Sequence, residues 1–215
     1  MKRLALIICV VMFLGTVGAF AAPKKGTMKD SRDGKAYKTV QIGSQTWMAE
    51  NLNYKTKDSY CYDNKKPNCA KYGRLYTWKT AQEACPVGWH LPSRGEFEML
   101  IKAVGGTMDK QEKRYWANAG KSLKSTSSWN ESDYGDGDGN GDDAFGFSAV
   151  PAGYVCCGGI YDAEGSITEF WSSTEGRSGN AYGNAYGMRL SSSDYGARLE
   201  DGDNRFGHSV RCIKN

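Results

Sequence analysis

Side chains alternate in character over residues 37–42, with Tyr37 on one face of an extended segment and Ile42 near the other. Gly43-Ser44 follows as a two-residue turn, and residues 46–48 supply a second short apolar run. Two alternating runs separated by such a turn are typical of a β-hairpin. The sequence therefore predicts a hairpin near the start of the domain.

Two helices are predicted next along the chain. Apolar spacing predicts a helix centred on residues 78–85, and Pro86 ends it. Ser93 and Glu96 then form a capping-box pattern, in which each side chain satisfies a free backbone N–H at the start of the second helix. The apolar stripe of that helix consists of Phe97, Leu100, Ile101 and Val104, and Gly105-Gly106 ends it.

The second half of the chain has a different character. After Lys121 it is rich in Ser, Gly, Asn and Asp, and only short apolar runs interrupt this composition. Helices early in the chain and short strands late in the chain predict an α+β fold. The strand-like runs are residues 147–150, 170–173, 186–190, 197–199 and 208–213.

The first residues have the pattern of a secretory signal peptide. Lys2 and Arg3 precede an apolar run over residues 4–17, and Ala19-Phe20-Ala21 supplies small residues for cleavage. A transmembrane anchor is the alternative, but it needs about 20 apolar residues, and this run is shorter. We therefore expect a signal peptide at residues 1–21 and a protein that is secreted, periplasmic or on the outer cell surface.

The rest of the chain predicts a short leader and one domain. Residues 22–35 are polar and lack periodicity, so we expect a flexible leader there. Residues 36–215 are numerous enough for a single domain with its own core. The formal net charge of +4 is scattered along the chain, which does not predict nucleic-acid binding.

Cysteines suggest covalent ties in an exported protein. Of the seven cysteines, Cys9 lies in the predicted signal peptide, so six remain. Cys61 and Cys69 bracket a polar loop that would gain from a local disulfide. A tie between Cys85 and Cys212 would join the end of the first helix to the last strand, although six cysteines allow many connectivities.

Adjacent Cys156-Cys157 leaves three alternatives open. The pair forms a vicinal disulfide, or two free thiols, or disulfides with separate partners. A vicinal disulfide would close a small strained ring and stiffen the loop around it. The sequence alone does not choose among them.

Six ordered blocks resemble the Fibrobacter succinogenes major paralogous domain family. The resemblance covers the chain from about Asp33 to its end. It implies a secreted or envelope-associated bacterial protein without an assigned reaction. The blocks are TWMAENL at 46–52, CAKYGRLYTW at 69–78, CPVGWHLP at 85–92, DAFGFSAVPAG at 143–153, FWSSTE at 170–175 and SVRC at 209–212.

A looser similarity extends to the C-type lectin-like fold, including its formylglycine-generating-enzyme division. In that fold the cysteine after the first helix pairs with the terminal one, which implies the Cys85–Cys212 disulfide. The calcium-dependent sugar motifs of true C-type lectins are missing, since Trp171-Ser172-Ser173 stands where a Trp-Asn-Asp triplet is expected and hydroxyls are poor calcium ligands. The paired redox cysteines of formylglycine-generating enzymes are not matched either.

One acidic segment is a candidate calcium site. Asp136, Asp138, Asn140 and Asp142 place side-chain oxygens at alternate positions, as the first half of a calcium-binding loop does. However, the twelfth loop position is Phe147 rather than a bidentate Glu. A solvated Gly-rich acidic loop is therefore the competing interpretation.

Other chemistry has little support in the sequence. Only His90 and His208 are available as imidazole ligands, and each favours a structural role. No block places a Cys or Ser nucleophile near a base and an orienting acid. We therefore expect no enzyme activity, and a formylglycine-generating-enzyme-like activity is a remote alternative.

Abundant aromatic residues favour a binding module. Many rings lie beside Gly or Ser in the second half, where exposure would suit stacking on sugar faces or contacts with proteins. We expect a polysaccharide or an envelope protein as the partner, and a purely structural envelope component is the alternative. Core packing is the competing explanation for each Trp. The candidate rings are Trp129, Tyr134, Tyr154, Tyr161, Trp171, Tyr182, Tyr186 and Tyr195.

Overall fold

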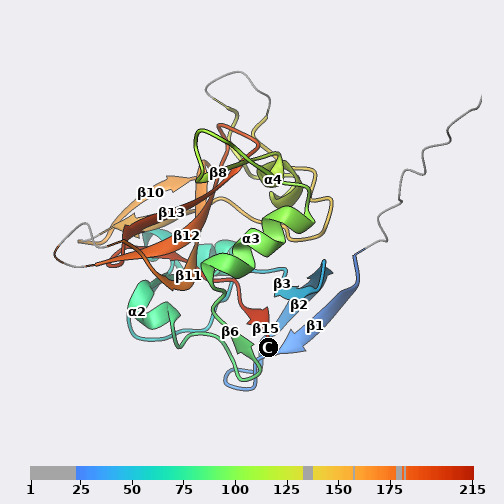
Figure 1. The fold of residues 1–215 in the computed structure, drawn as a ribbon. Helices are drawn as coiled ribbons and strands as arrows, with labels where there is room; N and C mark the ends of the chain where they lie inside the picture. The colour runs from blue at the N-terminus through green and yellow to red at the C-terminus, as the bar shows by residue number, and fades with distance from the viewer. Residues whose placement is uncertain (1–22, 133–137, 157, 178–180, 182) are drawn as a thin grey trace, which may run out of the picture.

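Two antiparallel-rich sheets and four short helices make up the part of the chain that the structure describes (Figure 1). The structure is a computed structural model, and it describes residues 23–132, 138–156, 158–177, 181 and 183–215. The fold is mixed α/β and consists mostly of strands. This agrees with the helices-and-short-strands fold predicted from the sequence.

The smaller sheet joins both ends of the described chain. Its strand order is β1-β2-β3-β15-β6, and Ile213 in the last part of the chain pairs with Trp47 and with His90. The predicted hairpin is confirmed, because Ile42 pairs with Gln45 across the turn. The strands are β1 Lys25–Lys29, β2 Ala36–Ile42, β3 Gln45–Met48, β6 Trp89–His90 and β15 Ile213–Lys214.

Strand β1 lies within residues 22–35, where the sequence predicts a flexible leader, so that expectation needs correction. Lys25 pairs with Val40 and Lys29 with Ala36 along β2. The connection between the strands is closed by Asp30, which is fully buried and accepts hydrogen bonds from Arg32 at 2.7–3.2 Å. Because β1 is a largely exposed edge strand, it has no apolar alternation from which it could be predicted.

The larger sheet has the order β4-β5-β14-β9-β11-β12-β13-β8-β7, and β10 pairs with β9. Predicted runs 170–173, 186–190 and 197–199 lie inside β11, β12 and β13, whereas the run 147–150 forms only a bridge at Ala149. The strands are β4 Ser59–Tyr60, β5 Leu75–Thr77, β7 Thr107–Met108, β8 Tyr115–Ala117, β9 Ala152–Cys156, β10 Ile160–Glu164, β11 Ile167–Glu175, β12 Asn184–Ser191, β13 Ala197–Asp203 and β14 Gly207–Ser209.

Helix α3 confirms the predicted capping box. Ser93 Oγ accepts a hydrogen bond from Glu96 N at 3.2 Å, and the Glu96 carboxylate accepts one from Ser93 N at 2.7 Å. The other predicted helix is shorter than expected, since α2 ends at Ala81. The helices are α1 Lys66–Tyr72, α2 Trp78–Ala81, α3 Arg94–Ala103 and α4 Ala119–Leu123, with a 3₁₀ turn at Tyr62–Asn64.

Helix α3 packs against β11, β12 and β13 of the larger sheet. Its Phe97 stacks on Trp47 of the smaller sheet, with ring centroids 5.4 Å apart, so the main core lies where the two sheets meet. Phe147 contacts the same Trp47 edge-on. The short segment around Phe147 is thereby fixed to the core although it forms no regular strand.

Two disulfides join the cysteines as expected. Cys61 pairs with Cys69, and Cys85 pairs with Cys212 across 127 residues. The long disulfide fixes the end of the chain beside the turn that follows α2. Cys156 has no disulfide partner among the described residues, and Cys157 lies outside them.

Candidate functional site

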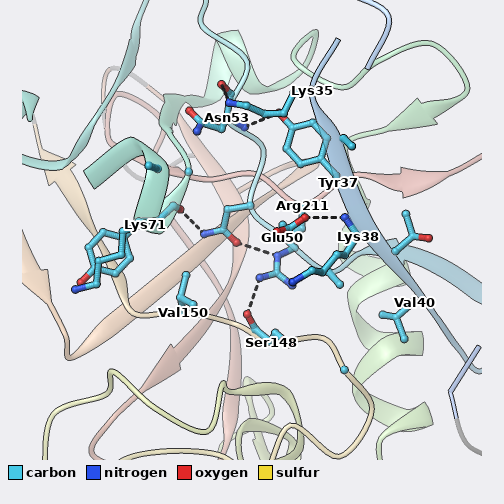
Figure 2. A pocket seen from close by; sticks show the side chains of 18 of the residues that line it. Lys35, Tyr37, Lys38, Val40, Glu50, Asn53, Lys71, Ser148, Val150 and Arg211 are labelled. Carbon is cyan, nitrogen blue, oxygen red and sulfur yellow. Dashed lines mark hydrogen bonds between the residues drawn. The ribbon is translucent and has the colours of Figure 1, made fainter. Parts of the chain in front are cut away.

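A cavity of about 680 Å³ opens between β2, the segment 49–53, helix α1 and the segment 146–150 (Figure 2). Basic side chains dominate its charged lining. Lys38 lies on the β2 side and Lys71 on the α1 side, and Arg211 lies between them. The lining also includes Lys25, Lys35 and a single acidic residue, Glu50. We refer to this feature as the basic cleft.

Helix α1 lines the cleft and packs closely against the segment 49–53, because it ends at Gly73. Gly73 has a φ of +77°, and a Cβ there would lie 2.6 Å from Asn51 Cβ and 2.9 Å from Leu52 O. A side chain at this position would push α1 away from the segment 49–53. The Cys61–Cys69 disulfide ties the same helix to the preceding turn. These two features hold one wall of the cleft in place.

Arg211 and Asn51 form the floor of the cleft. Arg211 Nε donates to Asn51 Oδ1 at 2.9 Å, and the two terminal nitrogens donate to the carbonyl oxygens of Phe147 and Ser148. Asn51 Nδ2 in turn donates to Tyr72 O at 2.8 Å. The floor therefore ties α1, the segment 146–150 and the last part of the chain to one another.

Arg211 is a fully buried cation without an ion pair among the described residues. Burial lowers the pKa of the guanidinium to about 9, and the charges of Asp143 and Glu50 partly oppose this shift. The group therefore stays charged at neutral pH. Its Cζ lies 4.4 Å from the centre of the Phe147 ring. The low dielectric constant of such apolar surroundings strengthens the electrostatic effect of the guanidinium charge.

The lysines above the floor are exposed and weakly paired. Lys71 Nζ lies 3.8 Å from a Glu164 oxygen, whereas Lys25, Lys35 and Lys38 make no ion pair in the described part of the chain. Glu50 accepts a hydrogen bond from the backbone N–H of Lys38 at 2.7 Å. The cleft consequently offers several unneutralised cations to an anionic ligand.

Trp129 and Trp171 are not exposed, so their predicted role in ligand stacking needs correction. They retain 5% and 1% of their accessible surface. Trp129 Nε1 donates to Ala149 O at 3.2 Å, and Trp171 Nε1 donates to Tyr76 O at 2.8 Å. Because each indole satisfies its only donor inside the core, both act as core residues here.

The four described tyrosines of the predicted set are half-buried and lie in separate environments. Tyr154 stacks on Phe206, and Tyr161 donates to Asn64 Oδ1 at 2.8 Å. Tyr186 lies 5.1 Å from the Arg94 guanidinium, and Tyr195 lies 5.7 and 5.1 Å from the ammonium groups of Lys121 and Lys124. These contacts do not unite the rings into one platform. Tyr134 and Tyr182 lie outside the described residues.

The candidate calcium residues serve local backbone contacts. Asp138, Asn140 and Asp142 accept hydrogen bonds from Asn140 N, Trp129 N and Ala144 N, respectively. Asp136 lies outside the described residues, and within them no three possible metal-ligating side chains come together. Calcium binding stays a prediction.

Most residues that line the basic cleft could not be recognised as site residues from the sequence. Lys25 and Lys35 lie in the stretch expected to be a flexible leader, and Arg211 was recognised only as part of a family block. One signal could have pointed to Arg211, namely its position between Val210 and Cys212 in the last strand-like run. The structure buries the whole segment Ser209–Cys212, and a buried charged residue needs internal hydrogen-bond partners.

Comparisons with known proteins identify the family. The profile of the Fibrobacter succinogenes major domain matches residues 40–214. Searches of curated proteins and of solved structures found no match. None of the helices in the described residues is long and apolar enough to span a membrane. Since the matched region covers most of the sequence, the chain belongs to the Fibrobacter succinogenes major domain family.

Proposed function

We propose that the protein is an exported, non-catalytic binding module that recognises an acidic polysaccharide in the basic cleft. The observation that carries the proposal is the unbalanced charge of the cleft, where four lysines surround a buried arginine and Glu50 is the only carboxylate of the lining. Such a surface attracts polymers that carry a carboxylate on each sugar.

Size and chemistry of the cleft support a sugar polymer as ligand. A cavity of about 680 Å³ lies in the range of small-molecule sites and can take a few sugar rings of a longer chain. Ammonium groups donate to carboxylates and hydroxyls alike. Exposed lysines bind each charge weakly, so affinity would come from repeated contacts along the polymer.

Export and the finer fold class belong to the same proposal. Two disulfides are typical of proteins from oxidising compartments, which supports a location outside the cytoplasm. The tie from the turn after α2 to the terminal segment and the pairing of β15 with β3 support a C-type lectin-like fold. We infer that sugar recognition takes place without the calcium motifs of true C-type lectins.

Affinity electrophoresis tests the proposal. We expect polygalacturonate in the gel to retard the oxidised protein, cellulose-derived and xylan polymers to have little effect, and added salt to weaken the retardation. The polymer should also keep its length, because no turnover is proposed. Equal mobility in every gel, together with retention of one envelope protein, would favour the protein-interaction alternative instead.

A further inference from the structure

A second cavity, of about 530 Å³, lies directly beside the basic cleft. The two cavities share part of their lining, namely Lys35, Asn53, Cys69 and Ala70. Lys35 Nζ donates to Asn53 O at 3.5 Å, and Figure 2 shows these two residues at the end of the cleft opposite Ser148. The second cavity therefore continues the cleft beyond this end. We refer to it as the basic extension.

The boundary between the basic cleft and the basic extension carries no aromatic side chain. Ala70 is exposed on α1 and contributes only a methyl group, and Cys69 is held in its disulfide with Cys61. Asn53 is fixed, because its Nδ2 donates to Cys69 O at 2.7 Å. Lys35 is exposed, and its contact with Asn53 is long for a hydrogen bond, so this side chain can move aside. An extended ligand can cross the boundary without displacing α1.

The basic extension adds positive charge to that of the cleft. Its lining includes Lys55, Lys66 and Arg74, none of which lines the cleft. These three side chains make no ion pair with any described residue. Asp33 is the only carboxylate in the described lining, and its Oδ1 accepts a hydrogen bond from the backbone N–H of Lys35 at 3.0 Å. Cations therefore outnumber carboxylates in both cavities, which attracts an anionic chain along both.

Arg74 gives the basic extension a fixed hydrogen-bond donor. The residue is half-buried, and its Nη1 donates to Ser59 O at 2.9 Å and to Ser59 Oγ at 3.3 Å. The other two guanidinium nitrogens have no hydrogen-bond partner in the described part of the chain. A guanidinium anchored through one nitrogen keeps its remaining donors in a planar arrangement that matches a carboxylate.

Tyr54 adds an immobilised ring to the same lining. Arg32 Cζ lies 3.8 Å from the centre of this ring, and Arg32 is itself held by the fully buried Asp30. The Tyr54 carbonyl oxygen also accepts a hydrogen bond from Tyr76 at 2.7 Å. A half-buried ring that is already fixed loses little conformational entropy when a sugar contacts it.

On the basis of the function proposed above, we propose that a single chain of an acidic polysaccharide occupies both cavities. The basic extension then binds the uronate residues that project beyond the basic cleft. This adds Lys55, Lys66 and Arg74 to the binding surface. Contacts in the two cavities reinforce each other, because binding of the chain in the cleft raises the local concentration of its next carboxylates. The ligand is accordingly a long chain, and an oligomer confined to the cleft lacks these additional contacts.

A variant pair and two oligomers test this extension. Lys55→Gln with Lys66→Gln removes two exposed charges of the basic extension, whereas Lys110→Gln with Lys113→Gln removes two exposed charges outside both cavities. Isothermal titration calorimetry would measure the binding of trigalacturonate and of decagalacturonate by the oxidised proteins. We expect the extension variant to bind decagalacturonate about tenfold more weakly and trigalacturonate like the wild type. The control variant should bind both oligomers like the wild type.

Comparison at a fixed oligomer length removes the effect of the number of ways in which a longer chain can bind. If the extension variant binds decagalacturonate like the wild type, the basic extension takes no part, and binding of trigalacturonate by the wild type would leave the basic cleft as the whole site. An equal loss for both oligomers would indicate a general charge effect and would also overturn the extension. Absence of binding of either oligomer to the wild type would overturn the proposed function together with this inference.

Discussion

Two fully buried cations are held by backbone oxygens. Lys124 Nζ donates to the carbonyl oxygens of Gly139, Ser191 and Asp194 at 2.7–3.0 Å. Arg211 combines two carbonyl acceptors with the side chain of Asn51. Since the desolvation of a buried charge is expensive, such residues are tolerated only where their hydrogen bonds are satisfied.

Replacing Arg211 should be strongly destabilising. In Arg211→Met the acceptors on Asn51, Phe147 and Ser148 lose their donors, and we expect a loss of about 3 kcal/mol in the free energy of unfolding. Arg211→Lys should recover only part of it, because an ammonium cannot reproduce the planar fork of donors. Urea denaturation would measure both. A change below about 0.5 kcal/mol in Arg211→Met would show that the floor is not held as described.

Acid should weaken the turn between β1 and β2 through Asp30. Hydrogen bonds from Arg32 lower the pKa of Asp30, although burial opposes this. The resulting stability is present above the unfolded pKa near 3.8 and is lost as the pH falls through the lower folded value. We expect Asp30→Asn to cost about 1–2 kcal/mol at neutral pH and less at low pH. Parallel stability curves for the two proteins between neutral and low pH would contradict this role.

At the scale of elements, the acidic loop after β8 and α4 is organised around an internal cation. Burial lowers the pKa of Lys124 to about 8, while Asp194 and Asp138 oppose the shift, so the ammonium remains mainly protonated at neutral pH. It bonds to the carbonyl of Gly139 within the segment that the sequence marks as a calcium candidate. Lys124 thereby supplies positive charge to this segment.

This arrangement gives Lys124 a structural role and predicts no stabilisation by calcium. We expect Lys124→Met to cost about 3 kcal/mol, because three carbonyl groups lose their shared donor. We expect calcium to leave the melting temperature of the wild-type protein unchanged. A calcium-dependent rise that disappears in Asp138→Ala with Asp142→Ala would support the calcium loop and contradict this expectation.

At the scale of the whole molecule, the two disulfides should contribute unequally. The Cys85–Cys212 bond closes 127 residues and the Cys61–Cys69 bond closes 8. The loop-entropy relation then gives about 5 kcal/mol for the long tie and about 2.5 kcal/mol for the short one. Denaturation of the two double Cys→Ala proteins would compare them. A larger loss on removal of the short tie would contradict the loop-entropy account.

Local signals were enough to predict some elements but not the cleft. The first hairpin has its own alternation and turn, and α3 has both residues of its capping box, so each could be recognised within a short window. Strand β1 has no such pattern because its pairing with β2 is what makes it a strand. The burial of Trp129 could not be predicted either, since buried and exposed aromatic rings occur beside the same kinds of residues in the sequence.

The basic cleft has a related explanation. Its lining comes from the first strands, from α1 and from residue 211 near the end of the chain, and only tertiary structure brings these together. Scattered lysines in a sequence therefore gave no indication of one cationic surface. The contact between His208 and Glu169 is likewise tertiary, since it arises from the pairing of β14 with β11.

Binding of polygalacturonate oligomers by charge-matched variants is the most direct test of the basic cleft. Lys35→Gln with Lys38→Gln removes two cleft charges, whereas Lys110→Gln with Lys113→Gln removes two exposed charges elsewhere. In isothermal titration calorimetry we expect the cleft variant to bind about tenfold more weakly and the control to bind like the wild type. Equal affinity of both variants would contradict recognition through the basic cleft.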